Sequence, residues 1–190
     1  LTQADPKWTA LLVAAHAGIS GGEIRRLRAD KDLYLNEKYP YIIFRGGDSR
    51  IAKTDARPRV VPIVIGLEVI KEFLPQTIKW MNSVDPKSPN QILNKRLRKL
   101  LGDEPDIKTH MFRHTWLRLS RRARISEDNK HAIAGWERGD RNNTVMERVY
   151  DAQGYTDDPE LLKQLYDDQK EIFSRFTHDL TKMDNVVQLG

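Results

Sequence analysis

Apolar residues recur at intervals of three or four along most of the chain, which predicts a mainly helical protein. Glycine, proline and asparagine separate the periodic segments. Ser126 stands before acidic residues, as a helix N-cap does, and Pro75 falls inside one segment, where it predicts a break or a kink. The predicted helices are Trp8–Ala17, Glu23–Arg28, Leu67–Met81, Gln91–Leu101, Thr109–Ala123, Ser126–Gly135, Asn143–Val149 and Asp158–Phe176.

Two runs rich in isoleucine, valine and tyrosine break this pattern, Tyr39–Gly47 and Arg57–Ile65. Both are bounded by glycine, proline or aspartate and predict β-strands, and the polar segment between them predicts a hairpin-like connection. We therefore expect an α+β fold, mainly α-helical with one small antiparallel sheet. Residues 1–176 form a single domain in this interpretation, and residues 177–190 form a loosely held tail.

The segment Thr109–Ala123 places two kinds of side chain on different faces of one helix. Its apolar stripe recurs at i, i+4, i+7 and i+11 and consists of Phe112, Trp116, Leu119 and Ala123. His110, Arg113 and His114 fall on another face. Two imidazoles beside a guanidinium suit contact or reaction with a phosphate group, although a solvated basic helix has the same composition.

The chain has 190 residues, of which 39% are hydrophobic and 31% charged, as in a globular domain. No apolar run approaches the length of a membrane span, and the N-terminal segment lacks the basic leader of a signal peptide. The absence of cysteine excludes disulfides and thiolate metal sites and fits a cytoplasmic protein. The chain begins at Leu1 without a methionine, so we expect a fragment of a longer protein.

The formal net charge of +5 predicts a polyanionic partner, double-stranded DNA before a membrane. Basic residues concentrate in Asn94–Leu100 and Arg118–Arg124, whereas Tyr155–Glu171 is acidic. We expect the basic middle of the chain to contact DNA mainly through phosphate groups, in a salt-sensitive manner. The candidate DNA-contacting residues are Lys53, Arg57, Arg59, Lys95, Arg96, Arg98, Lys99 and Arg121.

Several polar motifs follow one another in a defined order. Gly18 and Glu23 flank a turn before a short helix, and Lys53 lies between the two predicted strands. Further along the chain stand the H-x-x-R pair His110 and Arg113, then Trp136 and Tyr150. In this order and at roughly these separations, residues 1–176 resemble the catalytic domain of the tyrosine recombinases, the phage-integrase family. The motif H-x-F-R-H-T, His110–Thr115, is its most specific part.

The resemblance implies a recombinase-type fold and a site-specific DNA recombinase or integrase that cleaves and rejoins strands through a 3′-phosphotyrosyl intermediate. Tyr150 would be the nucleophile and Arg113 would hold a nonbridging phosphate oxygen. His110 would hydrogen-bond the phosphate or act as a general base. Lys53 would protonate the leaving 5′ oxygen, and the indole of Trp136 would donate to the phosphate.

Ser20 stands where the first motif of the family has an arginine. A serine cannot supply a guanidinium fork, so three explanations stay open: a weakened or inactive relative, an arginine that reaches in from elsewhere, or an introduced change. The spacing from Trp136 to Tyr150 is longer than is usual in the family, so Tyr155 is the alternative nucleophile. His114 is expected to pack or cap within the fold.

Other function classes remain open, namely a non-catalytic DNA-binding relative, a helix-turn-helix regulator formed by residues 91–123, and a type IB topoisomerase. The family needs no metal and no nucleotide cofactor, and the sequence has neither metal-ligand spacing nor a glycine-rich phosphate loop. The resemblance also implies an N-terminal DNA-clamping domain before Leu1, a bacterial or phage origin, and a homotetramer on DNA whose C-terminal element docks on the neighbour. We expect the isolated fragment to be a monomer.

Overall fold

The structure, a computed structural model, describes residues 5–45, 59–85, 89–102, 106–135 and 152–187, with side chains described for residues 154–175 of the last range. Helices surround a small antiparallel sheet, which confirms the α+β class. The helices are α1 (Pro6–Ala15), α2 (Gly21–Arg25), α3 (Leu67–Ser83), α4 (Pro89–Leu100), α5 (His110–Arg122), α6 (Glu127–Ala134), α7 (Ala152–Asp157) and α8 (Pro159–Val187). The strands are β1 (Leu33–Tyr34), β2 (Tyr41–Phe44) and β3 (Arg59–Pro62).

The sheet has the order β1-β2-β3, and both strand pairs are antiparallel. Every residue of β2 and β3 is buried, as the sequence predicts for their apolar residues, and Phe44 is paired with the charged Arg59 at the end of the sheet. The sequence did not predict β1, because its two residues are too short a run to produce an alternating pattern.

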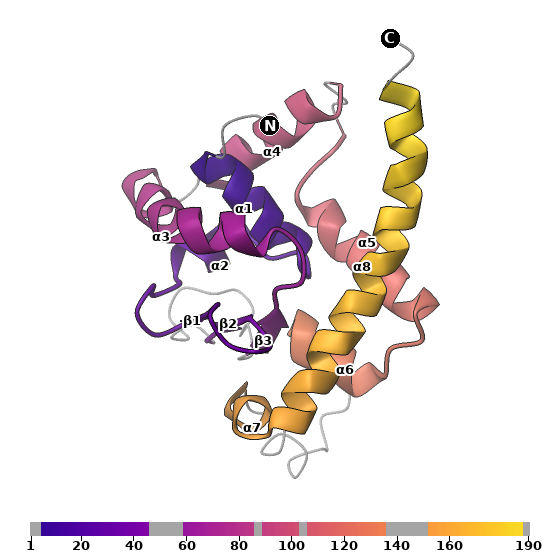
Figure 1. Ribbon diagram of the computed structural model, residues 1–190. Helices are drawn as coiled ribbons and strands as arrows, with labels where there is room; N and C mark the ends of the chain where they lie inside the picture. Colours follow the sequence, from indigo (N-terminus) through magenta and orange to yellow (C-terminus); the bar gives the residue numbers. More distant parts are fainter. Residues whose placement is uncertain (1–4, 46–58, 86–88, 103–105, 136–151, 188–190) are drawn as a thin grey trace, which may run out of the picture.

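Strand β3 lies where the two halves of the chain meet. Figure 1 shows α1, α2 and α3 on one side of the molecule and α5, α6 and α8 on the other. Strand β3 contacts α6, α7 and α8, while α1 contacts α3, α4 and α5. A single apolar core therefore joins segments that are far apart in sequence.

Most predicted helices are present, with boundaries that differ by a few residues. Ser126 caps α6 as expected, because its hydroxyl accepts a hydrogen bond from the backbone N–H of Asn129. Of the predicted break or kink at Pro75, the break does not form: this exposed residue lies inside α3, which continues to Ser83, and water can hydrate the carbonyl that proline leaves without a donor. The predicted helix at residues 143–149 lies outside the described residues.

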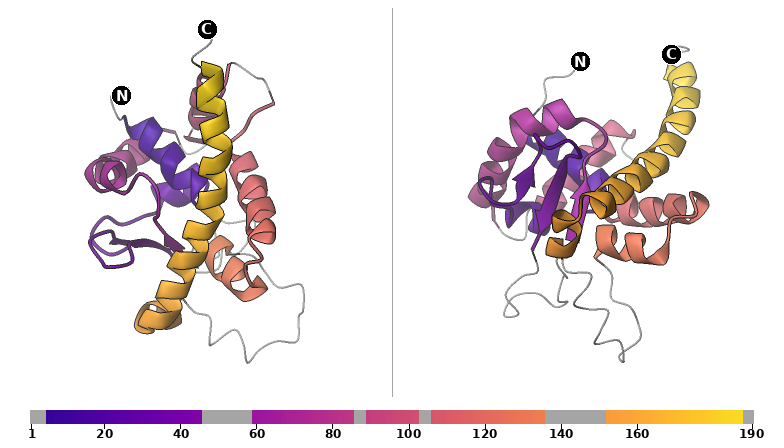
Figure 2. Two further views of the ribbon diagram at one scale, coloured as in Figure 1. Left: turned by 45° about the vertical axis from the view of Figure 1, so that its right-hand side comes forward. Right: turned by 60° about the horizontal axis from the view of Figure 1, so that its bottom comes forward.

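The C-terminal segment is more helical than the sequence pattern predicted. Helix α7 occupies a stretch in which no helix was predicted, and α8 continues through the expected tail to Val187. Figure 2 shows α8 running the length of the molecule, with its C-terminal end projecting past the helices on which it packs. Residues Leu162, Leu165 and Ile172 of α8 belong to the domain core, so this part of the helix packs on its own chain.

A buried amide attaches α8 to the rest of the domain. Gln169 accepts a hydrogen bond from the indole Nε1 of Trp116 in α5 at 2.9 Å. It also donates to the backbone carbonyl of His16 at 2.9 Å. Next to it on α8, Asp168 accepts a hydrogen bond from Asn129 of α6 at 2.6 Å. Side chains of α8 thus bind both α5 and the turn that follows α1.

Replacing Gln169 by alanine should therefore lower the free energy of unfolding by about 2–4 kcal/mol, because a buried donor and a buried acceptor both lose this partner. Urea unfolding followed by circular dichroism measures the change. Gln164→Ala is the matched control, since Gln164 is exposed on the same helix and its loss should change the free energy by less than about 0.5 kcal/mol. Equal effects of the two variants would contradict this role for Gln169.

His16 is fully buried at the end of α1 and is held in its neutral form. Its Nδ1 lies 2.8 Å from the Leu12 carbonyl, to which it donates, so its Nε2 accepts from the backbone N–H groups of Val64 and Ile65 at 3.3 Å. Burial lowers the pKa of His16 to about 4, while the bond to Leu12 opposes that shift. A charged imidazole would also lose the acceptor that binds these two N–H groups.

Protonation of His16 should destabilise the fold in acid. The unfolded chain takes up the proton near pH 6.5 and the folded chain only near pH 4, so stability is complete above 6.5 and falls as the pH drops towards 4. The expected loss is roughly 2–3 kcal/mol. Urea unfolding of the wild type, His16→Gln and the exposed-site control His110→Gln at several pH values measures it. The His16→Gln curve should be flatter, and a curve parallel to that of the wild type would exclude His16 as the titrating group.

Candidate functional site

The turn before α2 is fixed by a reciprocal pair of hydrogen bonds. The Ser20 hydroxyl accepts from the backbone N–H of Glu23 at 3.3 Å, and the Ser20 N–H donates to Oε2 of Glu23 at 2.8 Å. This is a capping box, the local reason why the helix begins here. The Ser20 hydroxyl also donates to the same carboxylate oxygen at 2.8 Å. The backbone N–H and the hydroxyl of Ser20 therefore both bind Glu23.

Gly18 brings this turn into direct contact with α5. Its φ of +67° lies in the left-handed region, where glycine is favoured. A Cβ atom on Gly18 would overlap the Cα and Cβ atoms of Arg113. The absence of a side chain at Gly18 therefore sets how closely the backbone of Arg113 approaches the turn that carries Glu23.

Arg59 carries a positive charge from the end of β3 into the interior. Its side chain is 3% exposed, lies over the ring of Phe44 and forms an ion pair with Glu23, which is 14% exposed. The second arm of its guanidinium donates to the backbone carbonyl of Ala134. The prediction that Arg59 is a surface contact for DNA is wrong, because the buried turn, strand and helix end enclose it.

Arg113 reaches the same carbonyl from α5. Its Nη2 donates to the Ala134 oxygen at 3.0 Å, and because Arg59 shares this acceptor, the two guanidinium groups lie within roughly 6 Å of each other. Two unit charges at that distance repel by about 3 kcal/mol at an effective dielectric constant of about 20. Burial and then the charge of Arg59 lower the pKa of Arg113, and Glu23 opposes them with a smaller effect.

The start of α5 is positioned by α4. The side-chain oxygen of Asn94 accepts from both the backbone N–H of Thr109, at 2.8 Å, and its hydroxyl, at 3.0 Å. One turn before Arg113, His110 is exposed and meets the ring of His114 edge-on, with centroids 4.7 Å apart. The expectation that His114 packs or caps within the fold is wrong.

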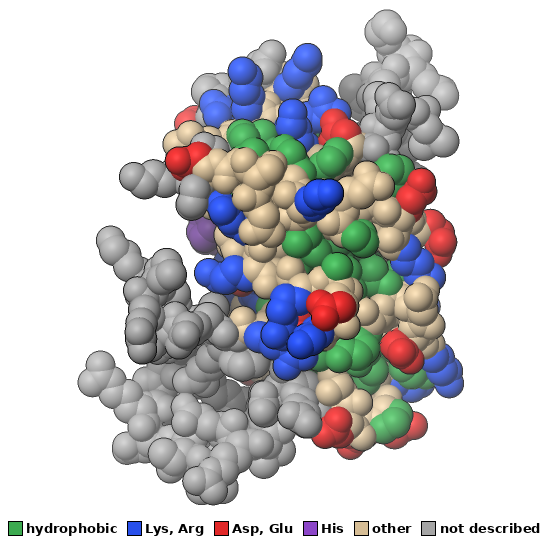
Figure 3. All heavy atoms as spheres, turned by 90° about the vertical axis from the view of Figure 1, so that its left-hand side faces the viewer, with side chains coloured by type: hydrophobic (Ala, Val, Ile, Leu, Met, Phe, Trp, Pro, Cys, Tyr) green, Lys and Arg blue, Asp and Glu red, His purple; other side chains and the backbone are tan. Residues whose placement is uncertain are grey.

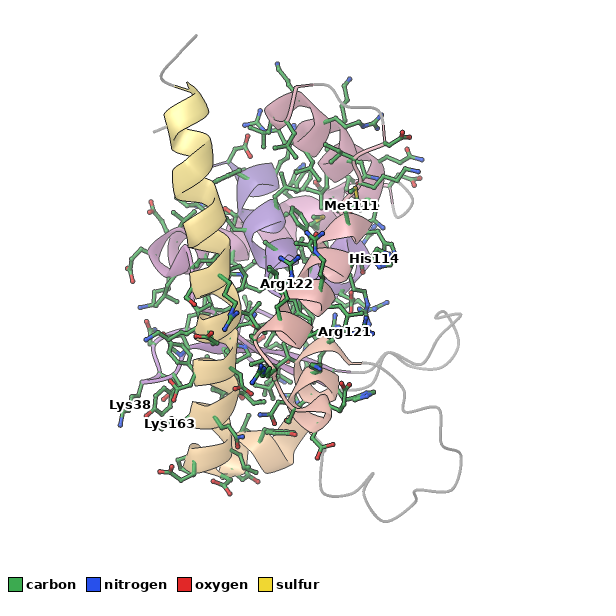
Figure 4. The ribbon with its side chains drawn as sticks, turned by 90° about the vertical axis from the view of Figure 1, so that its right-hand side faces the viewer. Lys38, Met111, His114, Arg121, Arg122 and Lys163 are labelled. Carbon is green, nitrogen blue, oxygen red and sulfur yellow. The ribbon has the colours of Figure 1, made fainter. Side chains whose placement is uncertain are left out.

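Figure 4 shows His114 and Arg121 on the side of α5 that faces away from α8. This exposed side of α5 also carries His110, so it places imidazole and guanidinium groups along one surface. The separation of this polar face from the core residues Trp116 and Leu119 is confirmed. The helix therefore has the two faces that its sequence predicts.

The structure describes the part of the predicted basic surface that α4 and α5 carry. Lys95, Lys99 and Arg121 are exposed, and Arg98 is half-buried with its Nε donating to the Asn94 carbonyl at 3.3 Å. Arg96 forms an ion pair with Asp5 at 3.3 Å, which engages part of its charge. Figure 3 shows lysine and arginine side chains gathered at the end of the molecule where α4 lies.

Part of the predicted site lies outside the described residues, namely Lys53, Arg57, Trp136 and Tyr150. The alternative nucleophile Tyr155 lies in α7 and is 2% exposed, so its phenol is enclosed by the core rather than presented to a ligand. Sequence reasoning missed the carbonyl of Ala134 and the inward direction of Arg59. The signal available for Arg59 was its place in an apolar run, where a strand buried on both faces forces a charged residue to find a partner.

The described residues include no group of three or more histidine, cysteine, aspartate or glutamate side chains that could hold a metal ion. Among these residues there is also no helix long and apolar enough to cross a membrane. Scans against protein-family models, curated proteins and solved structures give no significant match for this chain.

Gly18→Ala should lower the free energy of unfolding by roughly 2–4 kcal/mol, because the left-handed φ and the overlap with Arg113 both oppose a side chain. Chemical denaturation measures the effect. Gly22→Ala is the matched control in the same segment, since a Cβ there meets only the Ser20 hydroxyl, at 3.9 Å, and alanine favours the helix. A Gly18→Ala protein as stable as Gly22→Ala would show that the close contact with α5 is not required.

Proposed function

We propose that this chain is a DNA strand transferase of the tyrosine recombinase type, in which Arg113 binds the phosphate that is cut and Tyr150 attacks it. One observation carries the proposal. The motifs that the resemblance singles out are distant in sequence, yet the turn of Gly18 and Glu23 packs on Arg113, and Arg113 donates to the last residue of α6. This convergence is what a shared phosphate site requires.

Arg113 suits the role of phosphate ligand. It is half-buried, and one of its guanidinium nitrogens is fixed by the carbonyl of Ala134. Its position is set by three independent elements: the turn at Gly18, the carbonyl of Ala134 and the α4–α5 contact through Asn94. A fixed guanidinium stabilises the charge that develops on phosphate oxygens without having to reorganise during the reaction.

The chemistry follows from a tyrosine nucleophile. The phenol oxygen of Tyr150 forms a bond to phosphorus while the bond from phosphorus to the 5′ oxygen breaks, and the phosphotyrosine ester conserves the linkage for rejoining. His110, exposed one turn before Arg113, accepts the phenol proton or donates to the phosphate. Lys53 gives a proton to the departing 5′ oxygen, and Trp136 donates to the phosphate.

The exposed basic residues of α4 and α5 supply a path for the DNA backbone. Lys95, Lys99 and Arg121 are hydrated, so they attract phosphate groups without a desolvation cost. The start of α8 carries the opposite charge, which disfavours the DNA path there. On this proposal the chain assembles on its DNA as a homotetramer, and the projecting end of α8 is available for a neighbour.

A non-catalytic DNA-binding relative is the second candidate, and the capping role of Ser20 favours it. The Ser20 hydroxyl is hydrogen-bonded to Glu23 and carries no positive charge. A helix-turn-helix regulator is less suited to this geometry, because the connection between α4 and α5 runs from Leu101 to Thr109, whereas that motif uses a turn of about three or four residues. These two classes bind DNA without forming an adduct.

Incubation with a pool of nicked duplexes of randomised sequence should trap a covalent protein–DNA adduct, because a nick lets the leaving strand diffuse away before rejoining. Denaturing electrophoresis of labelled DNA detects the adduct. Tyr150→Phe should abolish it, and Arg113→Lys should reduce its rate by about 100-fold, because lysine keeps the positive charge but cannot place two parallel donors on the phosphate.

Tyr155→Phe is the matched control, since it removes a phenol oxygen five positions away in sequence and should leave the adduct intact. Adduct formation that depends on Tyr155 and survives Tyr150→Phe would reassign the nucleophile. Binding that weakens with salt while no variant, including the wild type, forms an adduct would instead establish the non-catalytic relative.

A further inference from the structure

Two guanidinium groups, those of Arg59 and Arg113, meet at one backbone carbonyl beside the end of β3. Arg59 is enclosed between the Phe44 ring, the Glu23 carboxylate and the Ala134 carbonyl. Arg113 donates to the same carbonyl. The repulsion that Arg113 experiences from Arg59 is larger than its attraction to Glu23. An anion that bound beside Arg113 would relieve this repulsion.

We infer that Arg59 and Arg113 form one oxyanion site for a DNA phosphate, in which Arg113 donates to the phosphate and Arg59 is a positioning residue that adds a second positive charge from behind. The inference rests on the proposed function for the identity of the anion. Arg59 of β3 would then supply the positive charge that Ser20, which caps α2, cannot supply.

The tethering of Arg59 makes its charge a fixed part of the site. Its two guanidinium arms are bound to Glu23 and Ala134, and the aromatic face of Phe44 lies against the planar group at 5.3 Å. A buried charge acts through a low dielectric, so it affects a nearby anion more strongly than a hydrated lysine at the same distance. Lys95 and Lys99 are exposed, so each should contribute less to phosphate affinity at this site than Arg59 does.

Inorganic phosphate is the probe for this site, at constant low ionic strength. Nitrogen–proton NMR spectra of the arginine Nε–H groups follow the titration, with the Arg59 and Arg113 signals assigned by their loss in Arg59→Lys and Arg113→Lys. In the wild type, both signals should shift with one common saturation curve. Phosphate affinity should fall by about tenfold in Arg59→Met and remain within about threefold of the wild type in Arg59→Lys, which keeps the charge.

Arg122→Ala is the control for general attraction to exposed positive charge, since Arg122 is exposed on α5, and it should change the affinity by less than about twofold. An Arg59 signal that stays still while Arg113 shifts would overturn the inference, and this readout does not depend on the folding of Arg59→Met. Equal phosphate affinities in a folded Arg59→Met and the wild type would also overturn it, as would an equal loss in Arg122→Ala.

The phosphate titration does not require Tyr150, so it separates this inference from the proposed reaction. If the wild-type protein forms no DNA adduct but shows the common Arg59 and Arg113 shift, the anion site is supported and the strand-transfer function is excluded. If the protein forms the Tyr150 adduct while the Arg59 signal stays still, the function is supported and the proposed role of Arg59 is excluded.

Discussion

The ion pair between Glu23 and Arg59 is the interaction on which the site depends. It joins the turn before α2 to the end of β3, and neither partner has much access to water. Such a pair is costly to bury unless its remaining hydrogen-bonding groups are also satisfied. Here Ser20 supplies donors to the carboxylate and Ala134 supplies an acceptor to the guanidinium. The pair is stable because neighbouring segments complete it.

This arrangement attaches Arg113 to packed elements of the fold. The carbonyl of Ala134 fixes the end of α6, and Gly18 lets α5 pack on the turn that holds Glu23. The position of Arg113 is therefore fixed by the turn at Gly18, strand β3 and helices α4 and α6. Sites supported in this way keep their geometry better than sites formed by side chains on a loop, because the supporting groups are themselves packed.

Local patterns predicted the helices and both faces of α5, because the spacing of Trp116 and Leu119 depends on nothing beyond the helix itself. The same holds for the cap at Ser126. The direction of Arg59 was not predictable in this way, since its partner Glu23 lies in another element and only the folded chain brings them together. The short β1 and the full length of α8 were missed because neither depends on a strong local signal.

A comparison within the molecule separates a structural charge cluster from one that suits a ligand. Asp32 binds Arg28 and Arg45, which also makes two positive charges for one carboxylate, but these arginine side chains are 48% and 52% exposed. Water compensates the excess charge there, so no ligand is needed. At the other cluster Arg59 is buried and Arg113 is half-buried, so water screens these two guanidinium groups less. Apolar residues of similar volume often replace a buried ion pair without loss of stability. Stability alone therefore does not require a guanidinium at position 59, and the anion site that we infer gives this group a role beside Arg113.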